Sequence, residues 1–292
     1  MALNKIAVFG LGLLGGSIAR ALKKIDQAVQ IDAYARHPHK IEEALKDQTI
    51  DRLSSLDDFS AAGIDLFIVA IPVVSSIDII KKILSDPNLS EKSLIIDVGS
   101  VKGQILEEIA NWPKANQFIG CHPMAGSEKT GYQNSSFDLY QGSTVIVTPQ
   151  ATNQKEDLEK VKSFWEKLGA EVFFTSALIH DQLVAYTSHL PHLISCLLVN
   201  NLKNYLGEKE DDDLSPFLGS GFKDLTRLAS GSSQMWVDIF SLNKKNMLLA
   251  LEGMKKELDF FKEMINKDSV SEQDLEFFLE KIKIFREQKI KK

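Results

Sequence analysis

The sequence predicts an α/β protein, with a Rossmann-type, doubly wound sheet in its first part and an all-α second part. Three observations predict this. Short β-branched and aromatic runs alternate with helical segments up to residue 176. A glycine-rich turn joins the first run to the first helix. From residue 177 onward, apolar residues recur at steps of three and four, as they do in helices. We therefore expect two domains, 1–176 and 177–292.

The alternation in the first part is regular. Its helices are expected at 17–24, 40–47, 75–85, 103–111 and 155–168. Its strands are expected at 5–10, 29–35, 65–72, 93–100, 117–123, 143–149 and 170–176. Strands joined by helical crossovers form a mostly parallel sheet, and ligands of such sheets bind beyond the carboxyl ends of the strands.

The glycine-rich turn is the segment GLGLLG, in which Gly10, Gly12 and Gly15 have the spacing G-x-G-x-x-G. The first glycine permits a tight turn, the second lets the backbone approach a pyrophosphate, and the third allows the helix to pack closely on the strand. The helix N-terminus, which begins with Leu13 and Leu14, offers free N–H groups to the anion. The turn therefore predicts a dinucleotide-binding domain. The alternative is a turn with a purely structural role.

The second strand lacks the acidic residue that usually binds the adenosine ribose hydroxyls at its end. Asp32 lies in the middle of this strand, Ala35 occupies its end and Arg36 follows. Without the carboxylate a 2′-phosphate is not repelled, and an arginine can pair with it. This favours NADP over NAD as the cofactor. Alternatively, Arg36 stacks on the adenine or faces solvent, and both cofactors can be used.

His122 lies at the end of a predicted strand, in the small and polar segment IGCHPMAGSEKTG (119–131). This is where a parallel sheet binds its ligand. Oxidation of an alcohol needs a base for the hydroxyl proton, and an imidazole with a near-neutral pKa suits that role. The alternative is an imidazole whose nitrogens are satisfied by backbone groups.

Two other residues at these strand ends could carry chemistry. Ser100, in DVGSVKG (97–103), could place its hydroxyl beside the nicotinamide and His122, or could cap the helix that follows. Cys121 could be a nucleophile, but its place in an apolar run favours a packed thiol.

Long apolar stripes predict the helices of the second part. Some of them must form an intramolecular core, but three such stripes could also bury surface between two chains. We therefore expect a homodimer that forms through the helical part. The stripes are Leu183, Tyr186, Leu190, Leu193 and Leu197; Met247, Leu251, Met254, Leu258, Phe261 and Ile265; and Leu275, Phe278, Ile282 and Phe285.

Three polar residues of the helical part could face a ligand. His189 and His192 stand three apart, on one face of a helix, and Pro191 between them suggests a helix start or a kink. No carboxylate or cysteine completes a metal-ligand set with them, so we expect no metal. Arg227 lies in a segment with glycines at both ends, 219–240. It could hold a carboxylate with two parallel hydrogen bonds, or form a surface ion pair.

The composition of the chain limits which partners and which cellular compartment we expect. The net charge is −6 and neither part is basic, so we expect no nucleic-acid partner. No segment reaches eighteen uninterrupted apolar residues, so we expect no membrane span. Two cysteines without metal spacing, and no signal-peptide cleavage site, fit a cytoplasmic protein. A plastid location would require a transit peptide that has been removed.

Taken together, these segments resemble the prephenate/arogenate (cyclohexadienyl) dehydrogenase family of tyrosine biosynthesis. The matching motifs are, in order, GLGLLGGS, DVGSVKG, GCHPMAGSEKTG, TPQ, HD at 180–181, SHLPH, GFKDLTR and MWVDIF. The resemblance implies hydride transfer from C4 of a cyclohexadienyl alcohol to the nicotinamide, with loss of carbon dioxide as the ring becomes aromatic.

The resemblance also implies residue roles. His122 would be the base, and Ser100 would orient it together with the cofactor amide. Arg227 would hold the substrate carboxylate, and Glu128 could pair with it at the pocket entrance. The whole substrate pocket would comprise His189, His192, Arg227, Ser127, Glu128, Lys129 and Trp236.

The choice between prephenate and arogenate is left open by the sequence. Both histidines of SHLPH favour prephenate, whereas a preference for NADP favours arogenate. Since the sequence ends at residue 292, we expect no tyrosine-sensing domain, and any tyrosine inhibition would act at the active site. Two alternatives are a β-hydroxyacid dehydrogenase or imine reductase, whose lysine motif is not seen, and a non-catalytic NADP-binding sensor.

Overall fold

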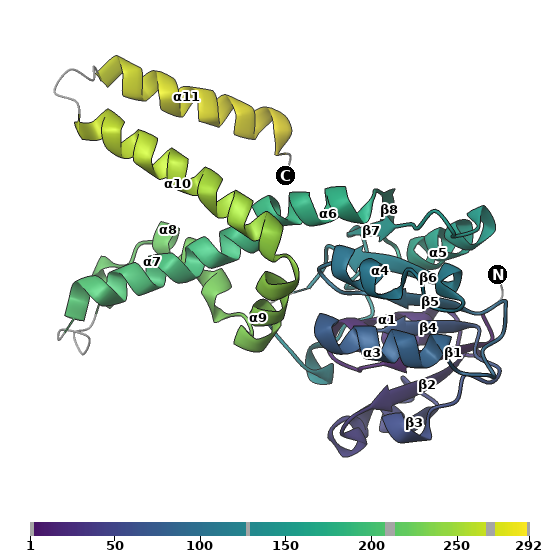
Figure 1. Cartoon of the computed structure of the whole chain (residues 1–292). Helices are drawn as coiled ribbons and strands as arrows, with labels where there is room; N and C mark the ends of the chain where they lie inside the picture. The colour runs from purple at the N-terminus through teal and green to yellow at the C-terminus, as the bar shows by residue number, and fades with distance from the viewer. Residues whose placement is uncertain (1–2, 127–128, 208–213, 267–271, 291–292) are drawn as a thin grey trace. The chain divides into compact units, whose positions relative to one another are not determined.

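An eight-stranded sheet forms the frame of the first part. The structure is a computed structural model that describes residues 3–126, 129–207, 214–266 and 272–290. The order of the strands across the sheet is β3-β2-β1-β4-β5-β6-β7-β8 (Figure 1). All neighbours pair in parallel except β6 and β7, which are antiparallel. The strands are β1 (Lys5–Phe9), β2 (Gln30–Ala35), β3 (Arg52–Ser55), β4 (Leu66–Val69), β5 (Leu94–Asp97), β6 (Phe118–Pro123), β7 (Thr144–Thr148) and β8 (Glu171–Phe174).

Helices alternate with these strands and continue alone after β8. Within the first part they are α1 (Leu13–Ile25), α2 (Glu43–Lys46), α3 (Val73–Leu84), α4 (Gly103–Ile109) and α5 (Lys155–Lys167). After the sheet come α6 (Ala177–Val184), α7 (Leu190–Leu206), α8 (Ser220–Thr226), α9 (Ser233–Leu242), α10 (Lys244–Asn266) and α11 (Glu272–Lys289).

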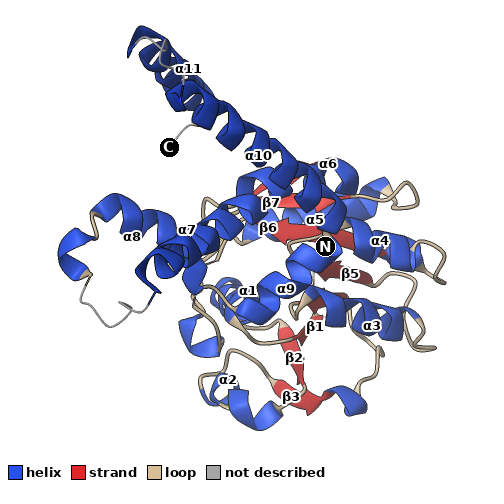
Figure 2. Cartoon of the chain, turned by 60° about the vertical axis from the view of Figure 1, so that its left-hand side comes forward, coloured by secondary structure: helices blue, strands red, loops and turns tan. Residues whose placement is uncertain are grey.

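The sheet is buried on both faces because successive side chains of a strand point to opposite sides. In β1, Ile6 and Val8 belong to one core, together with residues of α1 and α5. Ala7 and Phe9 of the same strand belong to a second core, with residues of α3 and α4. Figure 2 shows the strands as a layer with helices on either side. This explains why the strands read as continuous apolar runs rather than as alternating ones.

The structure differs from the expected elements at two places. The strand β3 was not expected, because its residues Arg52–Ser55 are mostly polar and it lies at the edge of the sheet. The apolar stripe that begins at Leu183 is not one helix. A π-helical turn, Ala185–His189, separates α6 from α7, and Pro191 stands in the first turn of α7. The helical backbone continues through this turn, and the proline, which has no N–H to donate, stands two residues after it.

Internal contacts divide the chain into residues 1–246 and 247–292. The first unit holds the sheet and the helices through α9. The second holds most of α10 together with α11, which pack through Phe278 against Phe260 and Phe261. The predicted boundary between residues 176 and 177 follows the last strand and stays a prediction. Among the described residues, no helix is both long and apolar enough to cross a membrane.

Candidate active site

The glycine-rich turn lies where β1 and β4 end side by side. Gly10 has a φ of +91°, a conformation that L side chains rarely adopt. A Cβ on Gly15 would lie 2.1 Å from the carbonyl oxygen of Gly10, so only glycine allows α1 to pack this closely. A Cβ on Gly12, by contrast, would meet nothing within 4 Å. The first and third glycines are therefore required by the fold, while the second borders open space.

That open space suits a pyrophosphate. Gly12 is the N-cap of α1, its cap has no side-chain hydrogen bond, and the first helical turn holds no acidic residue. The N–H groups of this turn are therefore available to an anion, and the helix dipole favours one. The turn formed by Gly10, Gly12, Leu13, Leu14 and Gly15 fits a dinucleotide.

The end of β2 is free of acidic side chains. Asp32 is buried within the strand, where its carboxylate lies 2.9 Å from the ammonium of Lys5. It therefore cannot serve as a ribose ligand at the strand end. Ala35 ends the strand and the Arg36 side chain that follows is exposed.

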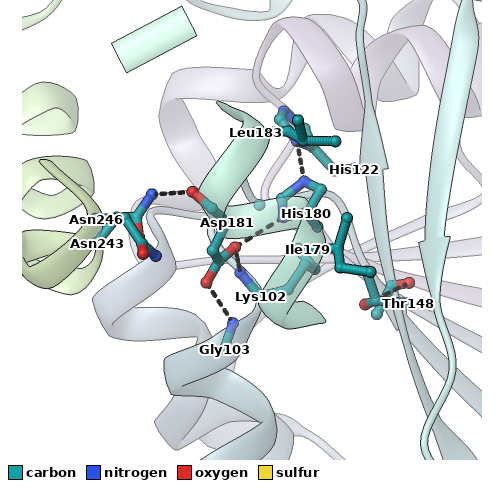
Figure 3. Close-up of polar contacts among 12 residues, drawn as sticks. Lys102, Gly103, His122, Thr148, Ile179, His180, Asp181, Leu183, Asn243 and Asn246 are labelled. Atoms are coloured by element: carbon teal, nitrogen blue, oxygen red, sulfur yellow. Dashed lines mark hydrogen bonds and ion pairs between the residues drawn. The ribbon is translucent and has the colours of Figure 1, made fainter. Parts of the chain in front are cut away.

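His122 lies near the end of β6 and is only 7% exposed. Its Nδ1 lies 2.8 Å from Nε2 of His180, in α6 (Figure 3). The partner of this nitrogen is therefore a second imidazole, not a backbone group. Burial lowers the pKa of His122 well below its usual value, and the neighbouring His180, Lys102 and His189 lower it further. The imidazole is thereby kept neutral.

His180 is held in turn by Asp181. Nδ1 of His180 lies 2.7 Å from Oδ1 of Asp181. The same carboxylate accepts hydrogen bonds from the backbone N–H of Lys102, at 2.9 Å, and of Gly103, at 2.8 Å. Asp181 thus satisfies the first amides of α4 from another helix. The N-cap residue of α4 is Lys102, without a side-chain cap hydrogen bond, so the alternative that Ser100 serves as its cap is wrong.

A buried ion pair lies beside this chain of groups. The ammonium of Lys102 contacts the carboxylate of Asp97 and donates to the carbonyl oxygen of Cys121, at 2.8 Å. Both charged side chains are almost completely buried. Burial also raises the pKa of the Cys121 thiol to about 12, which is the behaviour of a packed thiol rather than of a nucleophile.

Asn243, which follows α9, connects this network to His189. Its Nδ2 donates to the carbonyl oxygen of Asp181, at 2.8 Å, and lies 3.2 Å from Nδ1 of His189. Because an amide nitrogen only donates, Nδ1 of His189 accepts and its Nε2 carries the proton. That Nε2 is buried without a hydrogen-bond partner among the described residues. Burial lowers the pKa of His189 to about 4, so the ring is neutral.

His192 lies on α7 and stacks on Trp236 of α9, with ring centroids 3.7 Å apart and planes 12° apart. Trp236 also meets His189 edge-on, at 6.1 Å between centroids. A Cβ on Gly231 would lie 2.8 Å from the indole nitrogen, so glycine makes room for this stack. The two histidines and the indole therefore form one aromatic wall.

Arg227 begins the 3-10 turn Arg227–Ser230, which packs on α7. The N–H of Ala229 donates to the hydroxyl of Ser195 on α7, at 2.9 Å, and this fixes the turn. The Arg227 side chain is exposed. Ser100 is half-buried just beyond the end of β5. Ser127 and Glu128 lie outside the described residues.

A chain of polar contacts therefore connects His122 to His189 through His180, Asp181 and Asn243. The sequence had suggested no role for these three residues. The pair His180–Asp181 stood in the sequence only as a motif of the resemblance. No group of three histidine, cysteine or acidic side chains with metal-binding geometry occurs within the described parts of the chain.

A glycine turn open to a pyrophosphate, and a buried imidazole at the same edge of the sheet, define a dinucleotide-dependent oxidoreductase. Residues 18–174 match the family model of the prephenate dehydrogenase nucleotide-binding domain, and residues 176–284 match that of its dimerization domain. The chain belongs to the prephenate dehydrogenase family.

Individual relatives agree with this assignment. The chain is 32% identical to the prephenate dehydrogenase of Lactococcus lactis subsp. cremoris, over 98% of this chain and 77% of that protein. It is similar to the crystal structure of prephenate dehydrogenase from A. aeolicus in complex with hydroxyphenyl propionate and NAD+, with 34% identity, a TM-score of 0.88 and 99% of each chain covered. It is also similar to Synechocystis arogenate dehydrogenase, with 26% identity, a TM-score of 0.78, and 98% and 100% of the two chains covered. These matches confirm the predicted family and fold class.

Proposed function

We propose that this chain catalyses the oxidative decarboxylation of prephenate, arogenate or both, with hydride transfer to NADP or NAD. The products would be 4-hydroxyphenylpyruvate or tyrosine. The observation that supports this most strongly is the neutral, buried imidazole of His122, whose Nδ1 is engaged by His180, so that Nε2 would be the atom that meets the substrate. The family match supplies the reaction class.

In this proposal His122 takes the proton of the C4 hydroxyl through Nε2. A dinucleotide held at the glycine-rich turn would supply the acceptor for the hydride of C4. As the C–C bond to the ring carboxylate breaks, its electron pair enters the ring and carbon dioxide leaves. The oxygen becomes a phenol when His122 returns its proton. Aromatisation supplies the driving force, so the side chains need only position the substrate and move one proton.

The substrate would lie against the aromatic wall. His189 would donate its unpartnered Nε2–H to a substrate oxygen, since a buried donor without a partner is costly. His192 and Trp236 would provide a flat surface for the ring. Arg227 would hold a carboxylate, and Ser100 would orient His122 and the cofactor amide. The family resemblance adds Ser127 and Glu128 as substrate-binding residues.

Three further proposals concern the cofactor, the oligomeric state and the compartment. NADP would be preferred, because exposed Arg36 follows β2 where an acid usually stands. A homodimer would form through the helical part, which leaves Leu183, Tyr186 and Leu197 exposed and matches a dimerization domain. The protein would be cytoplasmic, as its few unpaired cysteines suggest.

The test is a grid of initial rates, with prephenate and arogenate each combined with NADP and NAD. Formation of reduced nicotinamide would be followed by absorbance, and the aromatic product by chromatography. The proposal expects turnover in at least one combination, with equal amounts of reduced cofactor and aromatic product. No turnover of either substrate would refute it.

A further inference from the structure

We propose that His180 and Asp181 are positioning residues that hold His122 in the tautomer with its proton on Nδ1, which leaves Nε2 as the lone-pair base. The inference rests on the proposed function, because a base is needed only if an alcohol is oxidised. It concerns two residues that touch neither the substrate nor the cofactor in the proposed reaction. Their role follows from the direction in which each hydrogen bond must run.

The chain of hydrogen bonds starts at Asp181, which can only accept while it is ionised. Three donors converge on it: the N–H groups of Lys102 and Gly103, and Nδ1 of His180. Two of these are backbone donors that cannot change direction. The carboxylate is thereby fixed in position, and its Oδ1 faces His180 at 2.7 Å. His180 must therefore carry a proton on Nδ1.

The next bond runs from His122 to His180. A neutral imidazole with its proton on Nδ1 has a lone pair on Nε2. Nε2 of His180 lies 2.8 Å from Nδ1 of His122, and His180 is 1% exposed, so water cannot supply a different partner. His122 must donate through Nδ1. Its remaining nitrogen, Nε2, then holds the lone pair that accepts a proton.

The opposite direction of hydrogen bonding is unfavourable at the bond between His180 and Asp181. If His180 carried its proton on Nε2, the lone pair of Nδ1 would face the Asp181 carboxylate at 2.7 Å. Two acceptors at that distance in a buried position repel each other, and a hydrogen bond is lost as well. His122 would then carry its proton on Nε2 and could not act as a base. The carboxylate therefore sets the protonation pattern of a ring that it does not touch (Figure 3).

This role differs from that of a helix cap. The amides of α4 would be satisfied by any carboxylate in this place, without a histidine between it and His122. His180 presents one nitrogen to each neighbour and is buried among them. A purely structural role would leave the tautomer of His122 unaffected.

The first test reads the tautomer without substrate. Protein labelled with ¹⁵N in its histidines would be studied by NMR at neutral pH, where protonated and unprotonated ring nitrogens have well-separated shifts. The chain has six histidines, so the His122 signals can be assigned by their loss in His122→Asn. We expect His122 to be protonated on Nδ1 and unprotonated on Nε2. A proton on Nε2 would overturn the proposal.

The second test compares two replacements of His180. The amide of His180→Gln can donate to Asp181 and accept from His122, so it preserves the order of the bonds. His180→Leu offers His122 no acceptor. We expect His180→Leu to lower kcat by about 10²-fold or more, and His180→Gln to keep at least roughly a tenth of the wild-type kcat. KM should change much less than kcat. Equal activity of the two variants would contradict the proposal.

A third comparison separates positioning from stability. Asp181→Ala removes the acceptor of His180, whereas Asp65→Ala removes a carboxylate that also accepts two backbone N–H bonds, from Asn4 and Lys5. Both variants should lower the melting temperature, but only Asp181→Ala should lower kcat and alter the His122 signals. Unchanged His122 signals in Asp181→Ala would overturn the proposal. If the wild-type enzyme turned over neither substrate, the proposed function would fail while the NMR result still decided the tautomer.

Discussion

A Cβ on Gly15 would lie 2.1 Å from the carbonyl oxygen of Gly10 and 3.0 Å from the Cβ of Ala70. No backbone can give way by that amount without moving α1 off the sheet. A Cβ on Gly12, only three residues away, would have no atom within 4 Å. Two glycines of the motif are therefore required by the fold, and the open space at Gly12 is where we expect the ligand.

Alanine substitutions separate these demands. We expect Gly15→Ala to lower the melting temperature strongly or to prevent folding. Gly12→Ala should fold normally, because its methyl group has room, but should weaken dinucleotide binding because that room is needed by the pyrophosphate. Thermal unfolding and titration with the cofactor measure the two effects. Normal cofactor affinity in Gly12→Ala would show that the pyrophosphate lies elsewhere.

Cofactor choice is expected to depend on the end of β2. Ala35→Asp combined with Arg36→Gln restores a carboxylate for the ribose hydroxyls and removes the partner of a 2′-phosphate. The ratio of kcat/KM for NADP to that for NAD should fall by about tenfold or more. Lys5→Gln serves as a control, because Lys5 pairs with Asp32 within the sheet and not at the strand end. An unchanged ratio in the double variant would refute the role of Arg36.

Asn243 should affect substrate binding without contacting the substrate. Asn243→Ala removes the donor to Nδ1 of His189, so the proton of His189 is no longer held on Nε2. We expect a higher KM for the substrate, and a loss of stability of about 0.5–1.5 kcal/mol from the lost hydrogen bond to the Asp181 carbonyl oxygen, which keeps its bond from the N–H of Ala185. Asn246→Ala is the matched control, since Asn246 donates to Oδ1 of Asn243. Equal effects of the two variants on KM would contradict this role.

The enzyme should remain active at acidic pH. His122 acts only when unprotonated, and its pKa is lowered well below 6.5 by burial first and then by the nearby His180, Lys102 and His189. The fall of kcat/KM on the acid side should therefore occur well below pH 6.5. Initial rates across pH, with substrate added last, measure it. A midpoint at or above 6.5 that is assigned to the enzyme would contradict a buried, neutral base.

The free energy of unfolding should also decrease as the pH falls below 6.5. His189 has a pKa of about 4 when folded and near 6.5 when unfolded, so the unfolded chain binds the proton first as pH drops. Its contribution is fully present above pH 6.5 and is lost as pH falls toward 4, by at most roughly 3 kcal/mol. Urea unfolding at several pH values tests this, with His189→Gln as the comparison. The wild type should lose more stability in acid than the variant.

The fold and the position of His122 could be predicted because their signals are local. A glycine spacing between a strand and a helix, and a histidine at a strand end, are visible within a few residues of sequence. The edge strand β3 was missed because four mostly polar residues carry no strand pattern.

The groups behind His122 could not be predicted in the same way. His180 lies 58 residues from His122 in the chain, and Asp181 lies 79 residues from Lys102. Only the packing of α6 against the sheet and α4 brings them together, and no periodicity encodes that. A buried aspartate that satisfies the amides of a distant helix has no sequence signature of its own. The likeness to a family marked the pair His180–Asp181, but not what it does.

The most direct test of the account is the turnover of His122→Asn. Asparagine keeps a donor near the position of Nδ1 but has no basic nitrogen to accept the hydroxyl proton. We predict that kcat falls by roughly 10²–10⁴-fold, with dinucleotide affinity and melting temperature close to those of the wild type. Turnover within a few-fold of the wild type would contradict the central claim that this imidazole is the base.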